Sequence, residues 1–233
     1  MPRTLDELAK EPRCGACARP QSTCVCDRLP SPRLASPLEI VVLQHPQEDD
    51  VVLGTASLIS RALEGAQVRV GLSWPSADAA IGRELARDRP LGQRWAVLFA
   101  TKEEGATREG SAELAPGTVR VLDRHGVPVP AGSPRLEGLI VLDGTWSQAK
   151  TLWWRNAWLL KLGRLALVPR EPSMYGKLRK EPRREWVSTL EAIADVLPAL
   201  GPESERERFE QSRQELRRLM RTMLQRVRDA LQG

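Results

Sequence analysis

Short apolar runs alternate with stretches of helical spacing along most of this chain. Two of the runs, WAVLF at 95–99 and GLIVL at 138–142, are continuously apolar, which is typical of strands buried on both faces. Further strands are expected at 38–44, 68–72, 119–122 and 165–168, and helices at 52–64, 77–88, 147–161, 188–199 and 203–231. Strands that alternate with helices predict an α/β domain with a mainly parallel sheet flanked by helices.

In a sheet of this kind, ligands bind beyond the carboxyl ends of the strands. This rule selects His45 after the first strand, residues 100–102 after WAVLF, and Asp143 after GLIVL. The sequence contains no internal repeat and no glycine-rich nucleotide loop, because GVPVPAG lacks the lysine that a P-loop needs. A P-loop nucleotide site is therefore not expected.

All four cysteines lie near the start of the chain, at Cys14, Cys17, Cys24 and Cys26. Two close pairs on short turns can present four thiolates to Zn²⁺, with a bond of about 2.3 Å to each sulfur. The alternatives are a disulfide and a redox Cys-x-x-Cys site, but the chain shows neither a secretory signal nor a βαβ pattern around the pair. Four thiolates leave no open position for substrate, so the expected zinc is structural. A zinc knuckle that grips RNA is a second role that stays open.

A proline-rich stretch, LPSPRLASP, follows the cysteines and is typical of a linker. We therefore divide the chain into a zinc-binding segment at 1–30, a catalytic domain at 38–200 and a C-terminal basic amphipathic helix at 203–233. The start of the chain lacks the apolar stretch of a secretory signal, and no apolar run is long enough to cross a bilayer. The expected location is cytoplasmic, with no membrane partner.

The charge of the chain is mildly basic, with a net charge of +5. Of its 35 basic residues six are lysine, which leaves 29 arginines, and the arginine fork suits phosphate. Codon bias is an alternative explanation, so charge permits an RNA partner without proving one. The last helix places Arg206, Arg213, Arg217, Arg221 and Arg228 opposite its apolar face, and we expect a solvated basic face there. Contact of that face with tRNA is the alternative.

Three segments carry residues suited to chemistry. The first, Asp143-Gly144-Thr145-Trp146, combines a carboxylate, a glycine, a hydroxyl and an aromatic ring where a buried strand meets a helix. The competing interpretation is that Asp143 caps the helix and Trp146 fills the core. The second, residues 169–184, is a basic loop around Tyr175 that can pair with phosphates and stack on a base, or can simply be solvated. The third, residues 188–192, is a helix start with a hydroxyl cap.

Four of the seven tryptophans lie between residues 146 and 158. Because Trp153 and Trp154 point in different directions on a helix, we expect one in the core and the other exposed. The pattern does not decide which of the two is exposed.

Taken together, these segments resemble the DTW-domain family. The D-x-T-W signature is met in full by residues 143–146, and the cysteine pattern, the HP-x-E of residues 45–48 and the Ser-Thr-Leu-Glu-Ala of 188–192 follow the same family in the same order. The resemblance extends from about residue 13 to residue 200. It implies a tRNA-uridine aminocarboxypropyltransferase with a SPOUT-like fold, which uses S-adenosylmethionine as its cofactor. The long helix beyond residue 200 lies outside the match.

The resemblance also implies roles for particular residues. It places the catalytic chemistry at Asp143, Thr145 and Trp146, with Asp143 as the base at uridine N3 or as the ligand of the cofactor's amino group. Cofactor binding is expected at Gly144, Trp146, Leu167, Tyr175, Ser188, Thr189 and Glu191, and RNA binding at Lys177, Arg179, Lys180 and Arg183.

The loop around Tyr175 departs from the family pattern. Many relatives have a compact Tyr/Phe-Arg-x-Arg-Lys loop, whereas here Gly176, Lys177 and Leu178 separate Tyr175 from Arg179. This leaves open which basic residue meets the RNA. A SPOUT-like RNA methyltransferase and a non-catalytic zinc-containing RNA-binding protein are the alternative functions, and the oligomeric state is open.

Overall fold

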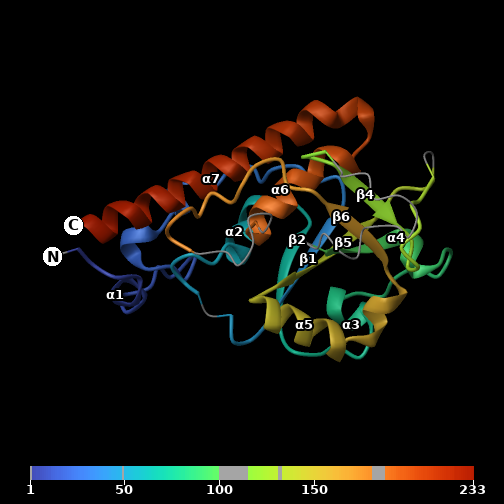
Figure 1. The fold of residues 1–233 in the computed structure, drawn as a ribbon, viewed down its shortest axis with the longest axis horizontal. Helices are drawn as coiled ribbons and strands as arrows, with labels where there is room; N and C mark the ends of the chain where they lie inside the picture. The colour runs from blue at the N-terminus through green and yellow to red at the C-terminus, as the bar shows by residue number, and fades with distance from the viewer. Residues whose placement is uncertain (1, 49, 100–114, 131–132, 180–186) are drawn as a thin grey trace.

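The computed structural model describes residues 2–48, 50–99, 115–130, 133–179 and 187–233. Its centre is a six-stranded sheet in the order β2-β1-β5-β3-β6-β4 (Figure 1). The strands are β1 (Glu39–Gln44), β2 (Ala66–Val70), β3 (Trp95–Phe99), β4 (Val119–Leu122), β5 (Gly138–Asp143) and β6 (Gly163–Leu167). All neighbours pair in parallel except β4, which runs antiparallel to β6. The predicted α/β domain with a mainly parallel sheet is confirmed.

Helices cover both faces of this sheet, as Figure 1 shows. They are α1 (Leu5–Ala9), α2 (Ala56–Ala62), α3 (Ala77–Ile81), α4 (Leu91–Arg94), α5 (Trp146–Arg155), α6 (Thr189–Leu200) and α7 (Arg206–Gln232). Alternate residues of β1 face opposite ways: Ile40 and Val42 join the core beneath α2, α6 and α7, whereas Val41 and Leu43 join the core beside α3 and α5. Burial on both faces explains the continuous apolar runs.

Some expected helices are shorter in the structure. The helix expected at 52–64 begins only at Ala56, and the one expected at 77–88 ends at Ile81, because Gly82 has a φ of +87° and terminates it. The helix expected at 147–161 breaks at Asn156 into α5 and a 3₁₀ turn, Ala157–Lys161. Residues 100–102, which follow β3, lie outside the described residues.

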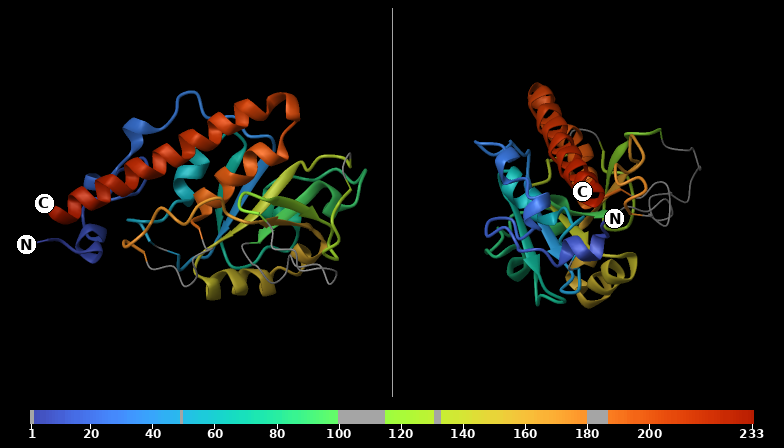
Figure 2. Two further views of the ribbon diagram at one scale, coloured as in Figure 1. Left: turned by 45° about the horizontal axis from the view of Figure 1, so that its top comes forward. Right: turned by 90° about the vertical axis from the view of Figure 1, so that its left-hand side faces the viewer.

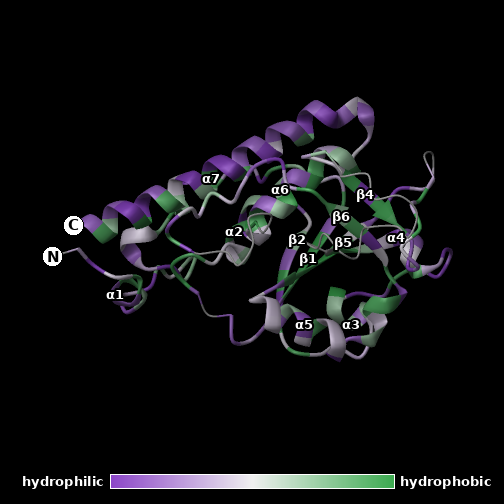
Figure 3. Ribbon diagram, viewed as in Figure 1, coloured by the Kyte–Doolittle hydropathy of each residue, from purple (hydrophilic) through white to green (hydrophobic). Residues whose placement is uncertain are grey.

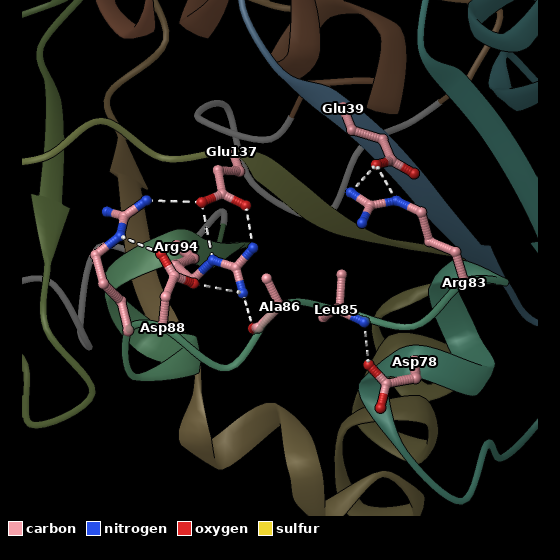
Figure 4. Close-up of polar contacts among 9 residues, drawn as sticks. Glu39, Asp78, Arg83, Leu85, Ala86, Asp88, Arg94 and Glu137 are labelled. Carbon is pink, nitrogen blue, oxygen red and sulfur yellow. Dashed lines mark hydrogen bonds and ion pairs between the residues drawn. The ribbon is translucent and has the colours of Figure 1, made fainter.

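The amino ends of the central strands carry a cluster of ion pairs (Figure 4). Arg94, just before β3, donates to Glu137, just before β5, through Nε at 2.8 Å and Nη2 at 2.5 Å. Arg89 adds a bond of 2.6 Å to the same carboxylate, and Arg83 donates at 2.8 Å to Glu39 at the start of β1. The charges at this end of the sheet neutralise one another.

Helix α7 has 27 residues, a length of about 40 Å, and lies across α6 and the N-terminal segment (Figure 2). Apolar residues of α7 such as Phe209, Leu216 and Met220 pack in the core, and hydrophobic and hydrophilic residues alternate along its ribbon (Figure 3). Neither α7 nor any other described helix has the sustained apolar stretch that crossing a bilayer requires.

The expectation of a fully solvated arginine face on α7 is wrong for two positions. Arg213 and Arg217 are buried, because Asp195 of α6 lies beneath them at 3.5 and 3.6 Å. Near the other end of α7, Arg226 pairs with Asp27 at 2.7 Å. Ion pairs therefore join α7 both to α6 and to the N-terminal segment.

Candidate functional site at the carboxyl edge of the sheet

Asp143 ends β5 opposite Gln44, the last residue of β1. Its carboxylate accepts a hydrogen bond from Gln44 Nε2 at 2.8 Å and another from Thr189 Oγ1 at 2.5 Å. The neighbouring His45 donates its backbone N–H to the Asp143 carbonyl at 3.0 Å. Asp143 is 8% exposed, and both of these side-chain donors are uncharged. His45 and Asp143, the residues that the strand-end rule selects, therefore lie side by side at the carboxyl edge of the sheet.

The next residue, Gly144, has a φ of +147°, a value that L side chains rarely adopt. A Cβ atom there would lie 2.9 Å from Gln148 Cβ and 3.4 Å from His45 Cβ. Only glycine fits this bend between β5 and α5 without strain.

Thr145, and not Asp143, caps α5. Its Oγ1 accepts from Gln148 N at 3.3 Å, and Gln148 Oε1 accepts from Thr145 N at 2.6 Å, which together make a capping box. The interpretation that Asp143 is only a helix cap is therefore wrong. Its carboxylate faces the start of α6 instead.

Trp146 is 53% exposed, so it does not fill the core either. Trp154, two turns further along α5, is 70% exposed, whereas Trp153 packs against the core beside α3. The expected division between Trp153 and Trp154 is confirmed, with Trp154 as the exposed one. The first turn of α5 thus presents an aromatic ring to solvent next to the Asp143 corner.

The start of α6 is a second capping box, and this one is buried. Ser188 Oγ accepts from Glu191 N at 3.2 Å, and Glu191 Oε2 accepts from Ser188 N at 2.9 Å. The same carboxylate accepts from Ser173 Oγ at 3.1 Å and from Met174 N at 2.8 Å. Glu191 therefore fixes the preceding loop to the turn that carries Thr189, the partner of Asp143.

Tyr175 follows this anchored loop and is 2% exposed. Its hydroxyl donates to the Leu53 carbonyl at 2.7 Å, and burial raises the pKa of the Tyr175 hydroxyl. The Arg179 guanidinium lies 5.7 Å from the centre of the ring and 3.8 Å from Asp50. The buried ring is not open to a nucleobase, so the idea that it stacks on one is wrong for this conformation.

The other predicted site residues are scattered. Leu167, at the end of β6, packs in the core, and Lys177 is exposed to solvent. Lys180 and Arg183 lie outside the described residues. The structure brings Asp143, Thr189 and Glu191 together at the carboxyl edge, and leaves the predicted basic residues on the adjoining loop.

The four cysteine sulfurs lie within 4.8 Å of one another. Two of the separations, Cys14 to Cys26 and Cys17 to Cys24, are 3.8 Å. A tetrahedral ion with bonds of about 2.3 Å requires sulfurs about 3.8 Å apart. Hydrogen bonds from the backbone N–H groups of Cys17 and Ala16 lower the pKa of the Cys14 thiol to about 6, whereas burial raises the pKa of the Cys24 and Cys26 thiols. The cluster fits a tetrahedral metal ion.

Sequence reasoning missed Arg19, which lies between the two cysteine pairs. It is 2% exposed and donates to the Gly54 carbonyl at 2.7 Å and to the Val52 carbonyl. Tyr175 takes the carbonyl between them, that of Leu53. No local pattern in the sequence marks Arg19 for this contact, whereas Gln44 could have been found from its position at a strand end.

Comparison with known proteins places the chain in a family. The DTW domain matches residues 11–228. The chain is similar to tRNA-uridine aminocarboxypropyltransferase 2 of Mus musculus, with 28% identity over 202 residues, which cover 84% of this chain and 59% of the mouse protein. It is similarly related to the protein of the same name from Drosophila melanogaster, with 28% identity over 84% of this chain and 70% of the fly protein.

A plant relative, tRNA-uridine aminocarboxypropyltransferase A of Arabidopsis thaliana, is 25% identical over 82% of this chain and 74% of its own length. No solved structure shows a significant match. The chain spans about three fifths of the length of the mouse relative. Since the family match covers nearly all of its residues, this chain belongs to the DTW domain family.

Proposed function

We propose that the protein transfers the 3-amino-3-carboxypropyl group of S-adenosylmethionine to N3 of a uridine in tRNA and releases methylthioadenosine. The observation that carries this proposal is the corner at Asp143. Two uncharged donors hold this carboxylate at the end of β5, and the exposed Trp146 begins α5 three residues later. The names of the relatives support the substrate and the group transferred. A SPOUT-like relationship is part of the same proposal, and the mainly parallel sheet is compatible with it.

The residues of this corner support separate roles in chemistry and in positioning. S-adenosylmethionine supplies an electrophilic γ-carbon, so that the N3–carbon bond forms as the carbon–sulfur bond breaks and its electron pair leaves with sulfur. Asp143 accepts the N3 proton, or alternatively binds the amino group of the cosubstrate. Gln44 and Thr189 hold the carboxylate in one orientation, since each donates to a different oxygen. Positioning decides which of the three carbons on sulfur reacts.

The remaining residues of the site are proposed to bind the two substrates. Gly144 leaves room for close approach, and Thr145 and Trp146 present a hydroxyl and a ring beside it. Ser188, Thr189 and Glu191 fix the start of α6, with Leu167 and Tyr175 packed behind. Lys177 and Arg179, with Lys180 and Arg183, are proposed to contact tRNA phosphates.

We also infer that the cysteine cluster holds one structural Zn²⁺. The separations between the four sulfurs support this, and a four-thiolate site has no open position for catalysis. Metal analysis of the purified chain should give one zinc per molecule. A metal-free chain with an unchanged melting temperature would contradict a structural role.

The function is tested by incubating the full chain with unmodified tRNA and S-adenosylmethionine, followed by mass spectrometry of the nucleosides. Aminocarboxypropyluridine, absent when Asp143→Asn replaces the wild type, is the expected product. A methylated nucleoside would indicate a methyltransferase instead. An unmodified tRNA, together with no calorimetric binding of S-adenosylmethionine, would indicate a non-catalytic RNA-binding protein.

A further inference from the structure

A hollow of about 550 Å³ lies between α7 and the loop that precedes α6. Most of its lining comes from one side of α7, where positions 213, 217 and 221 repeat at about 6 Å along the helix axis. The lining residues are Glu171, Met174, Arg213, Gln214, Arg217, Arg221, Leu224, Gln225 and Arg228. We call this hollow the α7 groove.

Two of the four arginines in the groove are engaged within the protein. Arg213 and Arg217 lie 3.5 and 3.6 Å from Asp195, and Arg217 also donates to Glu171 at 2.6 Å. Asp195 is 2% exposed, and burial raises the pKa of its carboxyl. These pairs hold α7 on α6.

The other two arginines, Arg221 and Arg228, are exposed, and neither forms an ion pair or a side-chain hydrogen bond with any residue in the described ranges. Four arginines line the groove, against the three carboxylates of Glu171, Asp195 and Glu210 that pair with Arg213 and Arg217, so the groove carries an excess of positive charge. Gln214 adds a side-chain amide that can donate to an anion, whereas the amide of Gln225 already donates to Asp229 at 2.8 Å.

Hydrogen bonds through the start of α6 connect the α7 groove to the candidate site. Met174 lines the groove, and its backbone N–H donates to Glu191 at 2.8 Å. Glu191 lies on the same first turn of α6 as Thr189, which donates to Asp143. A chain of negative charges lying along α7 would therefore run beside the loop that adjoins the Asp143 corner.

We propose that the α7 groove binds the phosphodiester backbone of the tRNA, away from the uridine that is modified. This inference rests on the proposed function for its ligand. Arginine forks bind phosphate oxygens two at a time, and the amide of Gln214 beside them can bind a further oxygen. Arg221 and Arg228 make the contacts, whereas Arg213 and Arg217 set the position of the helix. The groove adds affinity for tRNA without reading its sequence.

The test compares two double variants of the full chain that remove the same charge from the same helix. Arg221→Gln with Arg228→Gln empties the groove of its two available arginines. The matched control is Arg208→Gln with Arg218→Gln, because these side chains are 60% and 75% exposed, pair with glutamates three residues earlier, and do not line the groove. Binding of unmodified, labelled tRNA is followed by fluorescence anisotropy from about 50 to 200 mM salt.

The groove variant should bind tRNA on the order of tenfold more weakly than wild type, and the slope of log K against log salt should fall in magnitude by about 1.4 to 1.8, as for two lost phosphate contacts. The control should stay within about twofold of wild type, since its arginines are away from the groove. Equal weakening in both variants would mean that only net charge matters, and would overturn the proposal, as would wild-type binding by the groove variant. Melting temperatures of both variants show whether they are folded.

The outcomes also separate this inference from the proposed function. Wild-type protein that binds tRNA through the groove but transfers nothing to it refutes the transferase and leaves the groove standing. Wild-type protein that modifies tRNA, with a groove variant that binds as tightly, refutes the groove alone. A groove variant that loses affinity for polyglutamate but not for tRNA would assign the groove to an acidic polypeptide instead.

Discussion

The two ends of the parallel sheet give a carboxylate different partners. At the amino end, Glu137 is bound by Arg94 and Arg89, so its charge is neutralised within the protein. At the carboxyl end, Asp143 is bound by the amide of Gln44 and the hydroxyl of Thr189, which orient it but carry no charge. The ion pairs of Glu137 stabilise the fold, whereas the two uncharged donors orient Asp143 without an opposite charge. The position of a carboxylate along a strand matters less than the charge of its partners.

The largest effect should come from Asp143→Asn. We expect transfer to tRNA to fall by about 10² to 10⁴, the usual contribution of a general base. One of the two donors to the side chain loses its acceptor, which costs about 1 kcal/mol and lowers the melting temperature by roughly 2–4 °C. Single-turnover transfer assays and thermal melts measure the two quantities. A variant with wild-type transfer would remove Asp143 from the chemistry.

The next largest effect should come from Glu191→Ala, at the same end of the sheet. Three donors, Ser173 Oγ and the backbone N–H groups of Met174 and Ser188, lose their buried acceptor, and we expect a loss of more than about 3 kcal/mol in the free energy of unfolding. The matched control is Gln148→Ala in the exposed capping box of α5, where about 1 kcal/mol is expected. Denaturant titration measures both. Equal losses would mean that burial of the box is unimportant.

At the amino end, Glu137→Gln should destabilise the protein and leave the proposed transfer by the folded variant intact. Arg94 is 4% exposed and would lose its charged partner, and we expect a cost of about 2 kcal/mol because solvent reaches the Glu137 side chain. Glu39→Gln is the control. Its partner Arg83 is 49% exposed, so this variant should lose less than about 1 kcal/mol in the free energy of unfolding. Loss of transfer in folded Glu137→Gln protein would contradict the distinction between the two ends.

The smallest expected effect is the pH dependence of the free energy of unfolding that the Arg94–Glu137 pair contributes. The Arg94 guanidinium lowers the pKa of Glu137 below the ordinary glutamate value of 4.5, so the folded state favours the charged form. The resulting stability is fully present above about pH 4.5 and is lost as the pH falls through the lowered pKa. Unfolding of wild type and Glu137→Gln should therefore converge in acid. If the difference in free energy of unfolding between wild type and Glu137→Gln stays constant from pH 7 to low pH, the pair contributes no pH-dependent stability.

The sequence was sufficient to predict the sheet and the corner. Apolar runs such as 95–99 and 138–142 can be buried on both faces only in a parallel sheet with helices on each side, and a strand end is a ligand position by geometry. The exposure of Trp146 and the capping role of Thr145 then excluded the interpretation in which Asp143 caps α5 and Trp146 fills the core.

The sequence was not sufficient for contacts between distant residues. Asp195 and its partners Arg213 and Arg217 lie on different helices, so helical periodicity showed two arginines as solvated that are in fact buried. The hydrogen bond from Tyr175 to Leu53 joins residues 122 apart, and nothing in the local pattern of a basic loop indicates it. Such pairs depend on how elements pack, which local spacing does not encode.

The contacts of Arg19 and Tyr175 have a consequence for how the chain can be divided. Three consecutive peptide carbonyls, at residues 52, 53 and 54, are bound alternately by a side chain from the cysteine segment and by one from the loop ahead of α6. Removal of residues 1–30 would take away Arg19 and leave the Val52 and Gly54 carbonyls without this donor. These carbonyls belong to the turn whose Leu53 carbonyl accepts from Tyr175. The segment around Arg19 is therefore a structural part of the folded domain, and removing it should change the conformation of the remainder.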